Sequence, residues 1–279
     1  EIERKAGVEK TAGFFLMLFI VAGTFAVVYG ILYVANLIHP VLRFCLETFF
    51  IYQILATKSL KTESMKVYKK LKEGDLIGAR KEVSYLVGRD TENLDESEVA
   101  KADVETIAEN TADGVIAPML FIAIGGAPLG FAYKAVNTLD SMVAYKNEEL
   151  INIGFFSAKM DDICNFIPAR FAAVMLMIAS LILRFDFKGA VKIFKRDRFA
   201  HLSPNSAQTE AVAAGALQIQ LGGTHNYFGK AVVKPTIGDD IRPVEYEDIK
   251  RTNQLLYVSA VLSMAVCCLI TFLIYVQLF

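Results

Sequence analysis

The chain has 279 residues, of which 54% are hydrophobic and 21% are charged, and its formal net charge is −1. Soluble domains contain roughly 45–50% apolar residues, so this composition favours a membrane protein. The nearly neutral charge excludes a general basic field for nucleic acid. The four cysteines form no CxxC pair and are expected to be reduced packing residues.

Apolar runs predict helices that cross a lipid bilayer. Residues 14–38 and 255–279 contain no charged side chain, and each exceeds the ~20 residues that an α-helix needs to cross about 30 Å of hydrocarbon. Shorter apolar segments lie at residues 41–56, 114–136 and 166–184. We therefore predict an all-α, polytopic membrane protein with amphipathic cytoplasmic helices and polar loops. It is expected to form a single membrane-embedded domain over residues 1–279.

Two polar stretches, residues 58–81 and 184–198, are rich in lysine and arginine, and such loops usually stay in the cytoplasm. In the first stretch, apolar residues recur at helical spacing and Gly74-Asp75 interrupts the pattern. We expect two short amphipathic helices joined by a turn, close to the lipid headgroups. The chain is thus predicted to be a multi-pass cell-membrane protein whose active site faces the cytoplasm.

Two features within the apolar segments are unusual for a membrane span. Arg43 and Glu47 lie four residues apart and share a helix face, which fits either a buried ion pair or a charge lining a cavity. The run Gly125-Gly126-Ala127-Pro128 interrupts residues 114–136. Because each half is long enough for only about half a bilayer, this segment is either a kinked span or a re-entrant hairpin.

The first polar block contains a helix that Ser97 or Asp95 can cap. Three carboxylates fall on one stripe of this helix: Glu105, Glu109 and Asp113. Like charges at this spacing repel one another, and no lysine balances them farther along the helix, so the stripe indicates a bound cation. The simplest cation is Mg²⁺ held together with a phosphate substrate, and an ordinary acidic surface helix is the alternative.

The second polar block, residues 137–170, adds further oxygen and nitrogen groups. Three more aspartates are candidates for magnesium binding: Asp140, Asp161 and Asp162. Cations and short amides from the first and second blocks are candidates for binding phosphate or carboxylate: Arg89, Lys146, Arg170, Asn110, Asn137 and Asn165. These groups flank membrane segments, where charge is costly and is usually functional. For Asp161-Asp162, a role at a helix terminus is the alternative.

The third polar block, residues 200–239, contains Ser203-Pro204-Asn205, which predicts a helix start. Ser203 is expected to cap this helix and Gly222-Gly223 to end it. Its free amides are expected to face an anion, with His201, Ser203 and Asn205 as candidate substrate-binding residues. Glu210 lies in its second turn, where it can accept a proton from an attacking amine or hold a metal. The alternative is a capped amphipathic helix on the membrane surface.

Four strings match a known family in order along nearly the whole chain: VETIAENTADGVIAP, GGAPLGFAYKAVNTLDSM, DDICNFIPAR, and AHLSPN followed by EAVAAGAL. On these strings the sequence resembles the adenosylcobinamide-phosphate synthase family (CbiB) of late cobalamin biosynthesis. That family usually carries a further hydrophobic segment upstream, and this chain begins at Glu1, so we expect part of the N-terminus to be missing. Departures at Asn205-Ser206-Ala207-Gln208 and at Ala144 bear on substrate specificity more than on the reaction class.

The resemblance implies an ATP-dependent amide ligation. The free propionate of adenosylcobyric acid would be activated and then attacked by aminopropanol or by its phosphate. The implied cofactor is Mg²⁺, with ATP as co-substrate, and the implied partners are the corrinoid, the small amino alcohol and the lipid bilayer. The catalytic candidates are Glu105, Glu109 and Glu210. Assembly as a homo-oligomer, or with other cobalamin-assembly enzymes, stays open.

Two other functions are compatible with these residues. A Mg-dependent membrane prenyl- or phosphotransferase typically shows DxxxD-like motifs on two helices, and here only Asp161 with Asn165 comes close. A transporter with a broken helix at Gly125-Gly126 would normally show a paired half-repeat, and the sequence shows none. No standard P-loop motif occurs, so a nucleotide would have to be bound by other groups.

Overall fold

Helices make up nearly all the regular structure of this chain, which confirms the predicted fold class. The computed structural model describes residues 2–143, 152–227 and 229–278. They divide into two compact units. The first contains Glu1–Leu55, Ala117–Phe166 and Val266–Phe279, and the second contains Ala56–Ile116 and Ile167–Ala265. The expectation of a single membrane-embedded domain stays a prediction.

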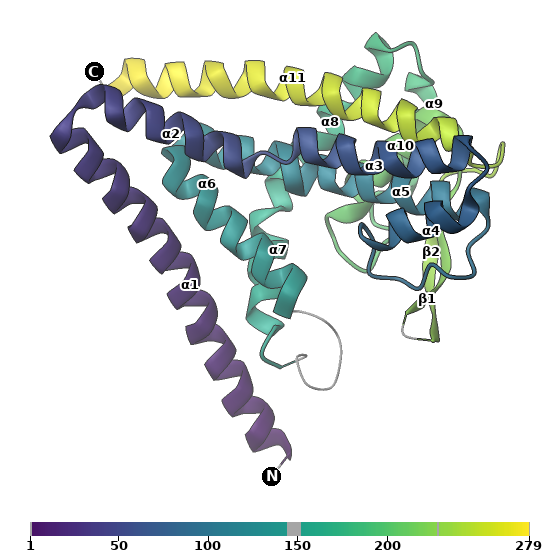
Figure 1. The fold of residues 1–279 in the computed structure, drawn as a ribbon, viewed down its shortest axis with the longest axis horizontal. Coiled ribbons are helices and arrows are strands. Elements are labelled where there is room, and N and C mark those ends of the chain that lie inside the picture. Colours follow the sequence, from purple (N-terminus) through teal and green to yellow (C-terminus); the bar gives the residue numbers. More distant parts are fainter. Residues whose placement is uncertain (1, 144–151, 228, 279) are drawn as a thin grey trace. The chain divides into compact units, whose positions relative to one another are not determined.

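The first unit is built from four helices and the end of a fifth, labelled in Figure 1. They are α1 (Ile2–Ile38), α2 (Pro40–Ile54), α6 (Ala117–Val143), α7 (Phe155–Cys164) and the last part of α11 (Tyr246–Leu278). His39 separates α1 from α2, and its ring nitrogen Nδ1 accepts a hydrogen bond from the Val41 amide at 3.2 Å. Pro40 is the first residue of α2, where its missing amide is not needed. α1 packs against α2, α6 and α7.

Three helical segments of the described chain are long and apolar enough to cross a membrane: Gly7–Ile38, Glu96–Val143 and Tyr246–Ile274. The pair α7 and α8 (Phe166–Ile182) counts as a fourth if it is one bent span. Within Glu96–Val143, only the part after Asp113 is free of charge until Lys134, so the apolar window lies there. α2 has 15 residues, too few for a full crossing.

The glycine break predicted in α6 is present, and a carboxylate from α2 accepts a hydrogen bond from the backbone just after it. Gly125 and Gly126 are non-helical, and Gly126 has φ 66° and ψ −164°, a region that only glycine adopts readily. Beyond the break, the amide of Ala127 donates to Glu47 Oε1 at 3.4 Å. Glu47 also lies 3.7 Å from Arg43. The carboxylate therefore supplies a partner to a helix start that lipid could not satisfy.

The Arg43–Glu47 ion pair forms but is not buried, since the Arg43 side chain is 51% exposed, whereas the cavity-lining interpretation fits the structure. The two side chains do pair along one face of α2, and they also border a cavity of about 330 Å³ within the first unit. Tyr29, Tyr33 and Asn36 of α1 complete the polar side of this cavity.

The second unit places a buried helix among other helices and a small sheet. Its elements are α3 (Thr57–Lys72), α4 (Leu76–Ser84), α5 (Glu96–Asn110), the π-helix η1 (Thr111–Ile116), α8, α9 (Phe187–Asp197), α10 (Ser206–Leu217), β1 (Leu221–Tyr227), β2 (Lys230–Ile237) and the start of α11. Every residue of α10 is buried, and this helix packs against α5, α9 and β2. Gly189 and Gly215 let the backbones of α9 and α10 touch.

Two local predictions in this unit are confirmed. α3 and α4 are separated by a turn in which Gly74 has φ 74° and the Asp75 carboxylate accepts from the Gly78 amide at 2.8 Å. Asp95 caps α5 and forms a capping box with Glu98. Ser97, the other candidate cap, instead donates to the carbonyl of Val244.

The third polar block differs from its prediction at both ends of its helix. α10 begins at Ser206, and no side chain caps it, because the Ser203 hydroxyl accepts from the nearby amide of Asn205 instead. The helix ends at Leu217 with Gln218 in the left-handed conformation. Gly222-Gly223 lie in β1, so they do not end the helix. The surface-helix alternative is also wrong, because α10 exposes no face.

The β1–β2 hairpin was not predicted. The two strands pair in antiparallel register with His225 opposite Val232 and a bulge after Gly222. Gly222 has φ 74°, and a Cβ there would collide with the carbonyl of Pro235. The two glycines therefore serve the bulge and its close backbone approach.

The break in α6 generates the first testable prediction. Gly126→Ala should destabilise the protein by about 1–3 kcal/mol, because alanine strains this backbone and its Cβ would lie 2.6 Å from Glu47 Oε1. Thermal unfolding in detergent measures the effect. Gly30→Ala is the matched control, since no atom lies within 4 Å of its Cβ position. Equal melting temperatures for the two variants would contradict the assigned role of Gly126.

Candidate active site

Polar side chains from three elements converge inside the second unit. α5 contributes Glu105 and Glu109, α10 contributes Glu210, and the β1–β2 hairpin contributes His225 and Lys234. The charges of Glu105, Glu109 and Lys234 all act on Glu210, which is only 5% exposed. This assembly, called here the carboxylate cluster, joins the first and third polar blocks of the sequence.

Glu105 ties the hairpin to α5. Its Oε2 lies 2.8 Å from the Arg89 guanidinium, and both side chains are largely buried. Its Oε1 accepts a hydrogen bond from the Gly222 amide at 2.7 Å. Both carboxylate oxygens are thus bound within the protein, so Glu105 holds the start of β1 against α5. The predicted catalytic role of Glu105 stays a prediction.

Arg89 also contacts His225, and this contact defines the state of the imidazole. A guanidinium nitrogen lies 2.8 Å from the His225 ring nitrogens. Burial, assisted by the positive charge of Arg89, lowers the pKa of His225 to about 4. His225 is therefore neutral near pH 7 and can accept a hydrogen bond from Arg89.

The neighbouring Asp90 fastens the far part of the hairpin. Its backbone amide donates to the carbonyl of Asn226 at 2.8 Å, and its carboxylate accepts from the amide of Gly229 at 2.8 Å. The hairpin is therefore held by consecutive residues of the segment before α5, in addition to Glu105.

Glu109 and Glu210 form the centre of the cluster. The Ser206 hydroxyl donates to Glu109 Oε1 at 2.7 Å, and Glu210 lies one turn farther along α10 on the same face. Burial, together with the charges of Glu109 and Glu105, raises the pKa of Glu210 well above its usual value. Glu210 therefore keeps its proton to a higher pH than an ordinary glutamate does.

Four predicted residues gather at the start of α10, as the third polar block suggested. The Arg170 guanidinium donates to Asn205 Oδ1 at 3.2 Å. The Ser203 amide donates to His201 Nδ1 at 3.0 Å. Burial lowers the pKa of His201, so its ring is neutral near pH 7. This helix start and the carboxylate cluster adjoin at Ser206.

Asp113 does not continue the stripe in a regular α-helix, and Asn110, a candidate for substrate binding, bonds within its own helix. Asp113 lies in η1, where the π-helical turn shifts side chains out of the i, i+4 alignment. Asn110 donates its side-chain amide to the carbonyl of Thr106 on its own helix. The three-carboxylate stripe is therefore two carboxylates on α5 followed by a third in a different helical geometry.

The second polar block belongs to the first unit, apart from residues 167–170, which include Arg170. Asp161 and Asn165 share a face as predicted, with the Asn165 amide donating to Asp161 Oδ2 at 2.9 Å and Tyr133 donating to Asn165. Asp162 instead pairs with Lys159 at 3.4 Å. Two further candidates, Asn137 and Asp140, lie near the end of α6, and Lys146 lies outside the described residues.

Among the described residues, no group of three or more His, Cys, Asp or Glu side chains is arranged to hold a metal ion. Mg²⁺ commonly takes only one or two protein carboxylates and completes its shell with water and substrate phosphates. The donors that fit such a requirement are Glu109 and Glu210, since both oxygens of Glu105 are engaged. The Mg²⁺ assignment, including Asp113, Asp140, Asp161 and Asp162, stays a prediction.

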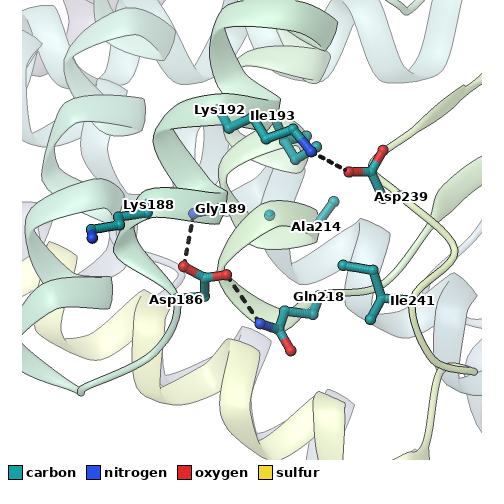
Figure 2. A pocket seen from close by; sticks show the side chains of 10 residues that line it. Asp186, Lys188, Gly189, Lys192, Ile193, Ala214, Gln218, Asp239 and Ile241 are labelled. Atoms are coloured by element: carbon teal, nitrogen blue, oxygen red, sulfur yellow. Dashed lines mark hydrogen bonds and ion pairs between the residues drawn. The ribbon is translucent and has the colours of Figure 1, made fainter.

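A separate cavity of about 410 Å³ lies beside α9 and α10, and Figure 2 shows its lining. Lys192 pairs with Asp239 at 2.9 Å, and Asp186 accepts from Gln218 and from the Gly189 amide. Its carboxylates are thus paired within the protein, and none of the predicted site residues line it.

Sequence reasoning missed His225 and Lys234, because Gly222-Gly223 had been assigned to a helix end. A signal for the hairpin was present in residues 221–237, where β-branched and aromatic residues are frequent on both sides of Gly229. Lys101 was also missed, although it precedes Glu105 by one helical turn.

The chain matches the family described as CobD/Cbib protein over residues 1–256. The cobalamin biosynthesis protein CobD of Clostridium perfringens is 55% identical to it over 94% of this chain and 83% of that protein. CobD of Listeria monocytogenes is 50% identical over 90% of this chain and 80% of its own length. The cobalamin biosynthesis protein CbiB of Salmonella choleraesuis is 48% identical over 88% and 77%. No solved structure matches.

The anchor at Glu105 generates the second prediction. Glu105→Ala removes the carboxylate partner of Arg89 and the acceptor for the Gly222 amide. The free energy required to open the hairpin locally should therefore fall by about 3 kcal/mol. Amide hydrogen exchange in residues 221–227 should then accelerate roughly 100-fold. Glu96→Ala, at an exposed position of the same helix, is the control. Unchanged exchange in the Glu105 variant would show that the hairpin is held by other contacts.

Proposed function

Because the chain belongs to the CobD/CbiB family, we propose that it is a membrane enzyme of cobalamin biosynthesis that forms an amide bond at the expense of ATP. The acid is adenosylcobyric acid, and the amine is aminopropanol or aminopropanol phosphate. The observation that carries this proposal is the Glu109–Glu210 pair: Glu210 is buried, Glu109 is partly exposed and bonded to Ser206, and the charge of Lys234 acts with both. Such a pair suits the binding and deprotonation of an amine.

The reaction requires two balanced steps. A carboxylate oxygen of the acid attacks the terminal phosphorus of ATP, so that an acyl phosphate forms and ADP leaves. The amine nitrogen then attacks the acyl carbon, the C–O bond to phosphate breaks, and the nitrogen loses a proton. The protein has to bind an ammonium ion, accept its protons and hold anions on the other side of the acyl carbon.

The carboxylate pair meets the first two requirements. Two adjacent carboxyl groups, one of them with a raised pKa, attract the ammonium form of the amine. Glu210 accepts a proton from it, because its raised pKa brings it closer to that of the amine than an ordinary glutamate would be. Glu109, fixed by the Ser206 hydroxyl, positions the amine.

Arg170 and the start of α10 meet the requirement for anion binding. The guanidinium of Arg170 is oriented by Asn205, and the first amides of α10 have no side-chain cap. A planar guanidinium beside a helix N-terminus suits a carboxylate or a phosphoryl group. Glu109 would supply one ligand to Mg²⁺, with substrate phosphates and water supplying the rest, and the ion would neutralise phosphate charge while Glu210 stays free to accept the proton.

The second unit holds both basic stretches, which supports a cytoplasmic active site. The lysine-rich α3 and the basic α9 belong to the same unit as the carboxylate cluster. Basic segments next to membrane spans usually remain in the cytoplasm. ATP is available on that side, so we assign the active site to the cytoplasmic face of the cell membrane.

A transporter is the second candidate, because the broken α6 and its cavity resemble transporter architecture. The two proposals differ in chemistry. Hydrolysis of ATP that depends on the corrinoid acid, together with formation of the amide, supports the ligase. Uptake of a corrinoid into vesicles without a covalent change would favour transport.

Glu210 gives the third prediction. As pH falls through its raised pKa, the base becomes protonated and kcat should decline, at a pH above that expected for an ordinary glutamate. Glu210→Gln should lower kcat at least ~100-fold and abolish this limb of the pH profile. Glu63→Gln, on the exposed side of α3, is the control. A Glu210 variant with a wild-type profile would remove it from the chemistry.

Arg170 gives the fourth prediction. Arg170→Lys keeps the charge but loses the planar pair of donors, so the KM for one anionic substrate should rise about tenfold or more. Arg184→Lys, in the loop after α8, is the control. If Arg170→Lys leaves every KM unchanged, the guanidinium serves only Asn205.

A further inference from the structure

The inner face of the β1–β2 hairpin carries positive charge that, among the described residues, is not matched by close ion pairs. His225 and Val232 lie opposite each other and share this face, together with Tyr227. Lys234 faces the bulge at Gly223, and its ammonium lies 5.4 Å from the centre of the Tyr227 ring. The half-buried side of the hairpin therefore presents Lys234 beside the neutral His225.

α5 adds a second lysine to the same place. The Lys101 ammonium lies 3.8 Å from the position that a Cβ would occupy at Gly223. The charges of Lys101, Lys234 and Arg89 all act on His225, which places the three cations around one imidazole. We call this group the hairpin cations.

Among the described hairpin cations, only Arg89 forms a close ion pair. Carboxylates act on the two lysines from farther away, Glu105 on Lys101 and Glu109 with Glu210 on Lys234, and burial lowers the pKa of Lys101. Glu105 pairs with Arg89 at 2.8 Å. Within the described part of the chain, neither Lys101 nor Lys234 has a carboxylate oxygen within 4 Å. Like charges gathered in a half-buried site repel, unless an anion joins them.

Lys234 is charged in this setting. Burial alone would lower its pKa, but Tyr227 and the carboxylates of Glu109 and Glu210 outweigh that effect, so the pKa of Lys234 is raised. The Glu109–Glu210 pair acts on this lysine without forming an ion pair with it. An anion bound by the lysines would therefore lie beside the carboxylates that we assign to the amine.

We propose that the hairpin cations bind the polyphosphate chain of the nucleotide, with Lys101 and Lys234 as the binding charges and Gly223 as the point of close backbone approach. The identity of the nucleotide rests on the proposed function, whereas the binding of a polyphosphate does not. A polyphosphate carries several negative charges, so it matches two lysine ammonium groups better than a single carboxylate would. Lysines and glycine backbone are also the groups that hold phosphate in loops of unrelated proteins.

Binding of inorganic tripolyphosphate to the full chain in detergent tests the site without turnover. Lys234→Met and Lys101→Met should each raise the Kd at least ~10-fold in calorimetric titration. Lys230→Met is the matched control, because Lys230 lies on the same strand and is exposed. Thermal unfolding confirms that each variant is folded. Wild-type protein that does not bind tripolyphosphate, or folded lysine variants with the wild-type Kd, would overturn the proposal.

Steady-state kinetics identify the source of the phosphate. If the nucleotide is the ligand, Lys234→Met raises the KM for ATP at least ~10-fold and leaves the KM for aminopropanol unchanged. A rise confined to aminopropanol phosphate would overturn the nucleotide assignment. If wild-type protein forms no amide from the corrinoid acid, the proposed function fails, and the tripolyphosphate titration still decides the anion site.

Discussion

The buried contact of Glu105 with Arg89 and Gly222 is the constraint on which the second unit depends. A carboxylate in a largely buried position is costly unless both its oxygens are paired, and here a guanidinium and a backbone amide pair them. The same contact brings a two-stranded hairpin against a helix. A two-stranded hairpin is only marginally stable by itself, so its position, and with it His225 and Lys234, follows from this contact.

The helices were predictable because neighbouring residues and the apolar composition of each segment determine where they form. Charge-free runs longer than a bilayer indicate spans, and Asp95 with Glu98 forms a capping box that can be read from four residues. The turn at Gly74 likewise follows from glycine and a capping aspartate. Glu109 and Glu210 were identifiable as residue types, but only packing showed that Ser206 joins their helices.

The remaining features depend on contacts that distant residues provide. The pair Gly222-Gly223 is compatible with a helix end or with a β-bulge. Glu105, more than a hundred positions earlier, accepts from the Gly222 amide and thereby favours the bulge. The π-helical turn at residues 111–116 contacts a distant segment, since the Gly114 carbonyl accepts from the Ala56 amide at 3.1 Å, and a helical period of 3.6 does not describe the position of Asp113 within it. In α6, the two glycines predicted a break. The acceptor for the Ala127 amide beyond it, Glu47, lies on another helix and could not be predicted.

The complete burial of α10 has a consequence for how members of this family can diverge. Its sequence after Glu210 is AVAAGAL, and a larger side chain at any of these positions would have to displace a packed neighbour. Gly215 touches the backbone of Gly189 and leaves even less room. Evolution toward a different substrate is therefore easier through the hairpin and the segment before α10, whose side chains are partly solvent-exposed, than through the helix that carries Glu210.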